Sequence, residues 1–405
     1  MSPHAHTRSE HAEPVGGPFF TPGVRAVALV AAVGSLAILW RLAFGLGATT
    51  ALNDGYPWGL WIAFDVVTGT ALACGGYAMA LLVYIANKGE YHPLVRPALL
   101  TSAFGYTMAG LSVFLDVGRY YLLWRVPIYF WHWNLNSVLL EVALCIMAYM
   151  VVLWLELSPA FLERGRTART PWVRRMSEAW LPVMKKALIW IIALGMLLPT
   201  MHQSSLGSLL LLSGPRLHPL WNTPFLPLLF LVSCIGMGYA AVVLEGALSA
   251  GAFGRRPDRD MLAGIGRYVA LIGVFYLVLR VGDLAWRGQL GALLAFDRAS
   301  VMSLIELALF VAGPLMLATD AQRRDYGNLV RAAMVLVLAG GLYRFDVFLV
   351  AFNPGAHWSY FPSVGETLVT SGLIALEILG YIYIVKNFPI LAGRPGAAGR
   401  MAAAR

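Results

Sequence analysis

Several ionisable side chains of this 405-residue chain lie inside long apolar runs. A charged group at the centre of a bilayer costs roughly 2.5–3.5 kcal/mol on insertion scales, so such a residue is a functional candidate unless it is paired. Asp65 and Glu141 have no obvious cation nearby in the sequence, and His202 lies in the polar stretch Pro199-Thr-Met-His-Gln-Ser-Ser205. Because carboxyl and imidazole groups commonly donate and accept protons in catalysis, these residue types indicate proton transfer.

Other ionisable residues also have structural interpretations. Asp116 and Arg119 are three residues apart on a predicted helix and could simply form an ion pair. Tyr106, in the middle of the third apolar run, could serve only as a hydrogen-bond donor between helices. Glu245 lies close to the end of its run and could extend its carboxylate to the headgroups.

The remaining charges inside the apolar runs are close to charges of opposite sign. Arg280 with Asp283, and Arg344 with Asp346, are predicted to form ion pairs near the membrane interface. Glu306 falls in the same half of the membrane as these four residues.

Resident metal cofactors are not expected. Of the eight histidines, only His202 lies inside a predicted span, whereas His132 lies next to the start of one. Haem b usually needs two facing histidines as axial ligands, so no haem is predicted. Three cysteines are fewer than the four thiolates that usually hold an iron–sulfur cluster, and no zinc-type spacing of His and Cys occurs.

The composition indicates the surroundings of these residues. Hydrophobic residues make up 59% of the chain and charged residues 13%, against about 25% in a typical soluble protein. This composition excludes a soluble enzyme, a disordered chain, a disulfide scaffold and a nucleic-acid binder. The net charge of +9 is best explained by basic cytoplasmic loops, and the chain is predicted to be an integral membrane protein.

Ten apolar runs are long enough to cross a bilayer as helices, because a span needs about 20 residues. Their length, and the lack of strand-like alternation, predict an all-α polytopic protein rather than a barrel. The predicted spans are 24–46, 57–86, 94–117, 133–157, 184–205, 224–250, 261–283, 300–319, 326–351 and 364–386.

The other segments are predicted as tails and a surface helix. Residues 1–23 are expected to form a flexible N-terminal tail, 24–390 the transmembrane domain and 391–405 a C-terminal tail. Segment 158–183, with Trp172 and Trp180 among arginines, predicts a short amphipathic helix on the membrane surface.

Basic residues predict the orientation. Of the 30 Lys and Arg residues, 20 lie at the two termini and in alternate loops, whereas five lie in the opposite loops. This bias predicts that both termini are cytoplasmic. Asp65 and Glu141 are each about eight residues into their spans, or roughly 12 Å below the outer surface. Acids, arginines and His202 thus gather in the outer half, as expected for a redox site that receives protons from the cytoplasm.

Several long motifs resemble the NrfD/PsrC family of quinone-interacting membrane proteins, in particular the HybB-like membrane subunits of hydrogenase-2-type nickel–iron hydrogenases. The resemblance runs from about residue 35 to 390. The motifs that carry it are Tyr56-Pro-Trp-Gly-Leu-Trp-Ile-Ala-Phe-Asp65, Ala73-Cys-Gly-Gly-Tyr77, Tyr91-His-Pro-Leu-Val-Arg-Pro-Ala-Leu-Leu100, Asp116-Val-Gly-Arg-Tyr120, Asn134-Leu-Asn-Ser-Val138 with Glu141, Leu198-Pro-Thr-Met-His-Gln-Ser-Ser205 and Val350-Ala-Phe-Asn-Pro-Gly355.

The resemblance implies an architecture and a function. It implies two four-helix bundles, formed by spans two to five and six to nine, flanked by spans one and ten, in the bacterial inner membrane. It also implies docking beneath a periplasmic ferredoxin-like iron–sulfur subunit, with hydrogenase large and small subunits as further partners. Such a chain would exchange electrons with the quinone pool, menaquinone or ubiquinone, while carrying no haem or cluster itself.

The resemblance also assigns candidate roles. Residues that match Tyr106, Glu141, His202 and Glu245 belong to a quinone site or proton route in HybB-like chains. We expect His202 and Glu141 nearest the quinone carbonyls, supported by Asp65, with Tyr106 and Glu245 leading toward the cytoplasm. Asp116 and Arg119 keep their motif context and complete the predicted site.

Three alternative functions follow from the same sequence. The chain could serve quinone chemistry in another complex, such as a polysulfide, sulfite or quinol:acceptor oxidoreductase. It could be a membrane anchor without its own quinone site. A secondary transporter is disfavoured because its site would lie at mid-membrane between inverted repeats, whereas the polar residues here favour one face.

Overall fold

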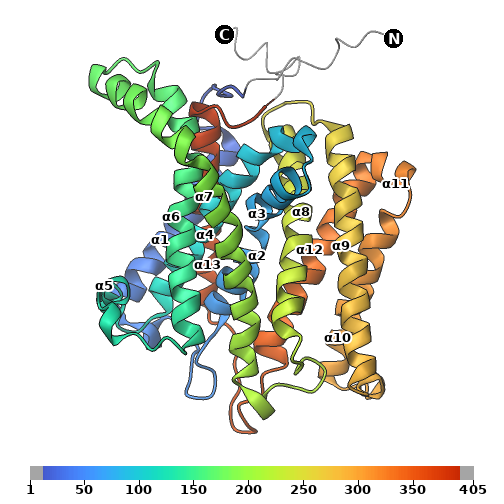
Figure 1. Ribbon diagram of the computed structural model, residues 1–405. Helices are drawn as coiled ribbons and strands as arrows, with labels where there is room; N and C mark the ends of the chain where they lie inside the picture. Colours follow the sequence, from blue (N-terminus) through green and yellow to red (C-terminus); the bar gives the residue numbers. More distant parts are fainter. Residues whose placement is uncertain (1–11, 393–405) are drawn as a thin grey trace.

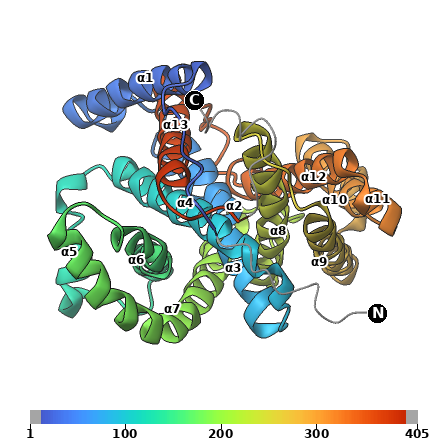
Figure 2. The ribbon, with the colours of Figure 1, turned by 90° about the horizontal axis from the view of Figure 1, so that it is seen from above.

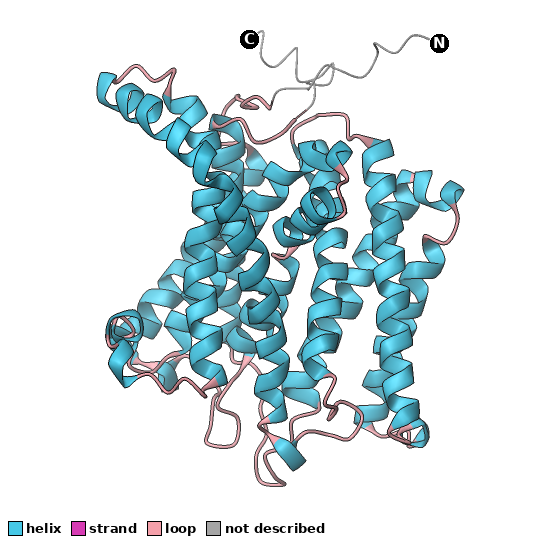
Figure 3. Ribbon diagram, in the orientation of Figure 1, coloured by secondary structure: helices cyan, strands magenta, loops and turns pink. Residues whose placement is uncertain are grey.

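The computed structural model describes residues 12–392, and regular structure in this part of the chain is helical throughout (Figure 3). An isolated β-bridge joins Leu217 to Phe352. Ten helical segments are long and apolar enough to span a membrane, as the sequence predicts. The all-α polytopic fold is therefore confirmed.

Seven spans are single helices, namely α1 (Pro22–Phe44), α6 (Val138–Gly165), α7 (Pro171–Leu211), α8 (Leu226–Ala252), α9 (Arg259–Trp286), α10 (Arg298–Met316) and α13 (Val364–Asn387). The third span joins η4 (Gly89–Leu94) to α4 (Val95–Asp116), and the ninth joins α12 (Tyr326–Phe345) to the π-helix η9 (Asp346–Val350). The connections contain η1 (Leu46–Ala48), η5 (Tyr120–Leu122), α5 (Arg125–Ile128), η6 (Phe130–His132), η7 (Gly214–Arg216), η8 (Leu290–Leu294) and α11 (Asp320–Arg324).

Side-chain caps fix where several spans begin. Ser137 accepts a hydrogen bond from the backbone of Leu140 at the start of α6, and Asp258 and Asp297 cap α9 and α10 in the same way. Ser363 forms a capping box with Glu366 at the start of α13. Such caps satisfy backbone N–H groups that the first helical turn leaves without partners.

The spans form two groups, which the view from above separates (Figure 2). One group contains the second span with α4, α6 and α7, and the other contains α8, α9, α10 and α12. α1 packs along α13 at the edge, where Gly34 and Gly372 let the two backbones approach closely. α3 and η2, from the second span, contact α8 and α12 and so join the two groups.

The second span is broken into four short pieces. These are the π-helix η2 (Trp61–Thr68), α2 (Gly69–Leu72), α3 (Gly75–Ala80) and the π-helix η3 (Leu81–Ile85). The break at Ala73 and Cys74 is stabilised by Ser102 Oγ, which accepts a 2.8 Å hydrogen bond from Gly76 N. Irregular backbone at membrane depth is tolerated only where protein buries it, and this span is the most buried of the ten.

Segment 158–183 does not form a separate surface helix, because α6 continues to Gly165 and α7 runs unbroken from Pro171 to Leu211. In Figure 1 this hairpin leans away from the other helices. Part of the predicted N-terminal tail is held by α13, since Val15 N donates to Val385 O at 3.1 Å. The remaining tail predictions, for 1–11 and 393–405, lie outside the described residues.

Candidate functional site

A buried polar group forms where α4 and α7 meet the broken second span. His202 and Gln203 on α7 and Thr70 on α2 are fully buried, as is Tyr106 on α4. Gln203 Nε2 donates to Thr70 Oγ1 at 3.1 Å and to Tyr106 OH at 3.3 Å, and His202 Nε2 lies 3.4 Å from Thr70 Oγ1. We call these four residues the central cluster.

The hydrogen-bond network determines which nitrogen of His202 carries a proton. Thr70 Oγ1 donates its own proton to Val66 O at 2.6 Å, so Thr70 can only accept from His202. His202 Nε2 is therefore the donor, and Nδ1 of the neutral ring carries a lone pair. His202 Nδ1 and Gln203 Oε1 are both buried without a hydrogen-bond partner. The cluster thus presents two free acceptors to a molecule that can donate.

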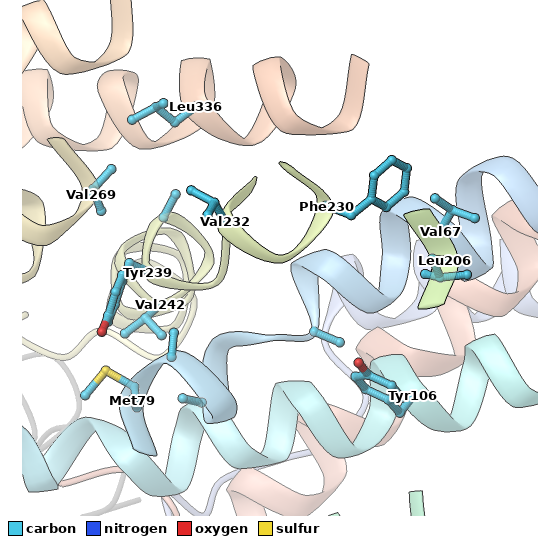
Figure 4. Packing of buried hydrophobic residues seen from close by; sticks show 14 of the residues in the cluster. Val67, Met79, Tyr106, Leu206, Phe230, Val232, Tyr239, Val242, Val269 and Leu336 are labelled. Carbon is cyan, nitrogen blue, oxygen red and sulfur yellow. The ribbon is translucent and has the colours of Figure 1, made fainter. Parts of the chain in front are cut away.

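Aromatic and apolar side chains enclose the central cluster. The ring of Tyr106 lies 5.6 Å from that of His202 and 4.5 Å from that of Tyr149, measured between centroids. Figure 4 shows Tyr106 reaching from α4 toward the second span, with Val67 and Leu206 among the buried side chains around it. The cluster therefore lies in surroundings of low dielectric, which strengthen electrostatic interactions.

The structure places Asp65 in a separate polar contact of the same bundle. Asp65 lies in the π-helix η2 and accepts hydrogen bonds from Thr370 Oγ1 at 2.9 Å and Ser112 Oγ at 3.2 Å. Thr370 belongs to α13, so the last span contributes directly to the environment of Asp65. π-helical turns occur frequently at functional sites because they redirect side chains.

α13 carries a stripe of polar residues from Asp65 toward the opposite end of the helix. Thr370, Glu377 and Tyr381 are separated by seven and four residues and therefore share one face. Glu377 lies within electrostatic range of Asp65, and Tyr381 OH donates to Glu245 Oε1 on α8. The carboxylate of Glu245 is thus held between α8 and α13. It does not extend to the lipid headgroups, which was the alternative that the sequence allowed.

Three other predicted residues lie outside this network. Glu141 is half-buried in the first turn of α6, closer to the helix end than predicted. Asp116 is half-buried at the end of α4, whereas Arg119 is exposed beyond it. No ion pair joins Asp116 to Arg119 among the described residues, and Asp116 instead lies within electrostatic range of the buried Arg41.

His202 also lies further from the end of its helix than the sequence predicts. α7 continues nine residues beyond it to Leu211, or about 13 Å, so the imidazole is not near the end of its helix. Among the described residues, other histidines lie in loops or in the 3-10 helices η4 and η6, and only His202 lies within the apolar part of a span.

The arginines have different partners from those predicted. Arg280 Nε lies 3.5 Å from Glu306 Oε1, and Asp283 pairs instead with Arg287, at 2.7 Å. Arg344 does not pair with Asp346 but donates to Val67 O at 3.1 Å and to Phe230 O at 2.6 Å. Both predicted pairs are therefore wrong. Arg344 and Asp346 are two residues apart and do not share a face, whereas Asp283 shares a face with Arg280 but pairs with Arg287 four residues further on.

The sequence did not single out five residues of these polar contacts, namely Thr70, Ser112, Thr370, Glu377 and Tyr381. Thr70 and Tyr381 resemble many polar residues of membrane helices, and nothing in the sequence distinguishes them. Glu377 did carry a signal, because it is an unpaired carboxylate in the middle of the last apolar run.

The chain resembles known proteins over most of its length. Residues 48–353 match the family described as "Polysulphide reductase, NrfD". The chain is 42% identical over 389 residues to the "Probable Ni/Fe-hydrogenase 2 b-type cytochrome subunit" of Escherichia coli, covering 95% of this chain and 96% of that protein.

More distant relatives extend the comparison. Identity is 30% over 253 residues to the "Menaquinone reductase, integral membrane subunit" of Nitratidesulfovibrio vulgaris, which covers 60% of this chain and 58% of that protein. It is 22% over 411 residues to a selenate reductase subunit of Mesobacillus selenatarsenatis, which covers 90% and 93%. The name of each of these three relatives identifies it as a subunit of a larger enzyme.

Proposed function

The chain belongs to the NrfD family, and we propose that it is the membrane subunit of a respiratory nickel–iron hydrogenase. In this proposal it passes electrons from a periplasmic iron–sulfur subunit to membrane quinone. The 42% identity to the hydrogenase 2 subunit, spanning nearly both chains, favours a hydrogenase complex with large and small subunits as partners. The relative named as a menaquinone reductase subunit favours quinone as the acceptor.

The observation that carries the quinone proposal is the pair of free acceptors in the central cluster. His202 Nδ1 and Gln203 Oε1 are buried, unpartnered and adjacent on α7. The two hydroxyl groups of a quinol can donate to such acceptors. When His202 is protonated, Nδ1 becomes a donor and can bond a quinone carbonyl, so the same side chain suits both redox forms of the substrate.

The chemistry requires proton transfer at His202. Reduction of quinone to quinol takes two electrons, which the iron–sulfur subunit supplies, and two protons. Protonated His202 delivers one proton from Nδ1 to a quinone oxygen, is reprotonated through its polar surroundings, and then delivers the second proton. In the opposite direction the Nδ1 lone pair accepts the proton that the quinol releases.

Protons reach the site along α13 and the second span. Glu245 and Tyr381 form the inner end of this route, Glu377 the middle, and Asp65 with Thr370 the outer end. The distance along α13 from Thr370 to Tyr381 is about 16 Å. Water molecules bridge the intervals between these side chains, since the direct contacts do not form a continuous chain.

The remaining candidates lie at the outer end of the bundle. Glu141, Asp116 and Arg119 are half-buried or exposed near helix ends, so we assign them to the entrance of the site and to docking of the iron–sulfur subunit. The excess of basic residues in alternate loops supports an inner-membrane protein with both termini in the cytoplasm.

The proposal includes no haem in this chain. The E. coli relative is named a b-type cytochrome subunit, and axial ligation of haem b requires side chains such as two histidines. His202 has no second histidine opposite it in the described spans, so the residues present do not fit bis-histidine ligation. In this proposal the iron–sulfur subunit would supply the electrons that reduce quinone.

Purification of the intact complex from membranes tests the proposed function. We expect hydrogenase subunits to be identified with the chain and quinone to be extracted from the complex. Association with hydrogenase but no bound quinone, together with hydrogen-to-quinone activity that persists after the chain is removed, would support a pure anchor. Association with a different oxidoreductase would contradict the assignment to hydrogenase.

A further inference from the structure

The turn that joins α6 to α7 carries a dense cluster of positive charge. We call residues 164–180, which include this turn and the start of α7, the hairpin tip. Residues 164–175 contain no acidic residue. They do contain five arginines, all of them exposed, namely Arg164, Arg166, Arg169, Arg174 and Arg175. The preceding acid, Glu163, is engaged elsewhere, because it pairs with Arg96 at 2.9 Å.

The arginines do not stabilise the hairpin itself. The two helices pack through small residues, since a Cβ on Gly165 of α6 would lie 2.1 Å from Ser177 Oγ of α7. Arg174 lies in the first turn of α7 and Arg175 directly follows it, where the positive end of the helix dipole disfavours a cation. Repulsion among the five like charges adds to this cost. A negatively charged partner outside the hairpin would offset both effects.

An exposed apolar stripe lies beside these arginines on α7. Trp172, Met176, Val183 and Trp190 are separated by four, seven and seven residues, so they share one face of the helix. All four are exposed, as is Trp180 near the same face. Trp190 lies in the apolar part of the span, where an exposed side chain faces lipid. The lipid-facing stripe of the span therefore continues along α7 into the hairpin tip.

The combination of arginines and tryptophans identifies the partner. Tryptophan is enriched at membrane interfaces, and arginine binds phosphate groups through two parallel hydrogen bonds. Clusters of four to eight basic residues next to a span recognise anionic lipid headgroups. A soluble anion or an acidic protein would match the arginines, but neither accounts for an apolar stripe that is continuous with the lipid-facing side of the span. In Figure 1 the hairpin leans outward from the other helices, toward the surrounding lipid.

We propose that the hairpin tip binds anionic phospholipids. The five arginines bind the phosphate groups, while Trp172, Met176 and Trp180 insert at the boundary between headgroups and acyl chains. The surface thereby fixes the angle at which the hairpin leaves the helix bundle. This inference does not depend on the proposed quinone chemistry or on the identity of the partner complex.

Native mass spectrometry of the intact complex in detergent tests the proposal, with phosphatidylglycerol and phosphatidylcholine as the added probes. We expect phosphatidylglycerol to bind more tightly. Each basic residue near an anionic surface contributes roughly a fivefold factor in affinity, so the triple change Arg169→Gln, Arg174→Gln and Arg175→Gln should weaken phosphatidylglycerol binding about 100-fold. An unchanged affinity of the triple variant for phosphatidylglycerol would overturn the proposal.

A matched control removes the same charge from dispersed sites. Arg25, Lys88 and Arg256 are exposed, and they lie at the helix ends and loops that the chain topology places on the same side as the hairpin tip. Their simultaneous replacement by glutamine should leave tight binding of phosphatidylglycerol unchanged. An equal loss in this control would show that net charge alone attracts the lipid, which contradicts a specific surface at the hairpin tip.

A second variant separates lipid from soluble anions. The double change Trp172→Gln and Trp180→Gln keeps every arginine but removes the apolar anchors. It should weaken binding of phosphatidylglycerol, whereas Trp286→Gln, at an exposed tryptophan at the opposite end of the molecule, should not. Undiminished binding in the double variant, together with displacement of the lipid by inorganic phosphate, would show a site for soluble anions and would refute the assignment to lipid.

Discussion

Replacement of His202 by glutamine isolates the proton chemistry proposed for the central cluster. Glutamine is polar and similar in size, so it keeps a hydrogen bond to Thr70 but cannot carry a proton at the position of Nδ1. Because His202 is fully buried and its Nδ1 has no other partner, no nearby group is in place to substitute for it. We therefore expect hydrogen-dependent reduction of quinone to fall sharply in His202→Gln.

The size of the effect follows from the contacts of the ring. A positioned general acid or base contributes roughly 10²–10⁴-fold to rate. The 3.4 Å contact between His202 Nε2 and Thr70 Oγ1 is long, and a hydrogen bond of this kind is worth about 1 kcal/mol, or about fivefold. We expect His202→Gln to lower the rate about 100-fold, whereas Thr70→Val lowers it about fivefold.

The assay compares two electron acceptors in the same membranes. Under the proposed function, reduction of a soluble quinone analogue by hydrogen would require the membrane subunit, whereas reduction of a viologen dye would report on the hydrogenase alone. Ser204→Ala is the matched control, since Ser204 neighbours the cluster on α7 but bonds only to backbone carbonyls of its own helix. The reasoning is refuted if His202→Gln retains quinone reduction within threefold of the unmodified complex while viologen reduction is unchanged.

Three further changes test the proton route and the packing that supports it. Glu377→Gln should slow proton uptake from the cytoplasmic side about tenfold, because it removes the carboxyl group that lies on α13 between Thr370 and Tyr381. A pH indicator in inverted vesicles measures this uptake, and an unaltered rate would exclude Glu377 from the route. Glu245→Gln keeps an acceptor for Tyr381 OH but cannot release a proton, so the rate of proton uptake should fall while the Tm of the complex stays within a few degrees. A large fall in Tm together with the loss of uptake would indicate a structural role for Glu245. Gly238→Leu should destabilise the complex by about 1–3 kcal/mol, because a Cβ there would lie 2.6 Å from the backbone oxygen of Cys74. Thermal unfolding measures this loss of stability. Gly251→Ala is the control and should be neutral, because a Cβ at Gly251 would lie in open space.

Hydropathy alone located the helical spans because a membrane imposes a simple length requirement. Each of the ten predicted runs overlaps a helical span, and the largest boundary error is at the start of α7. There the residues before 184 are polar enough to resemble a surface segment, yet they continue the same helix from Pro171. Helical backbone bonds continue into water at no extra cost, so hydropathy marks where the bilayer ends and not where the helix ends.

Partners in the site were predicted less well, because sequence distance along a helix does not give the facing helix. Arg280 and Asp283 were paired by proximity in sequence, but Arg280 reaches Glu306 on α10. Asp65 appeared to lack a partner until α13, some 300 residues later, placed Thr370 beside it. Charge and burial together identified which residues need partners, and only the packing of helices determined which partners they have.

The part of the second span before its break brings these partners together. Asp65 in η2 contacts α4 and α13, and Thr70 in α2 contacts α7, just before the helix stops at Ala73 and Cys74. Gly238 on α8 packs directly against the backbone oxygen of Cys74, and Gly76 N is satisfied by Ser102. The close packing of one bundle against the other therefore stabilises the break that positions Thr70 and Asp65. It follows that a bulky residue at Gly238, in the second bundle, should disturb the central cluster as well as the stability of the protein.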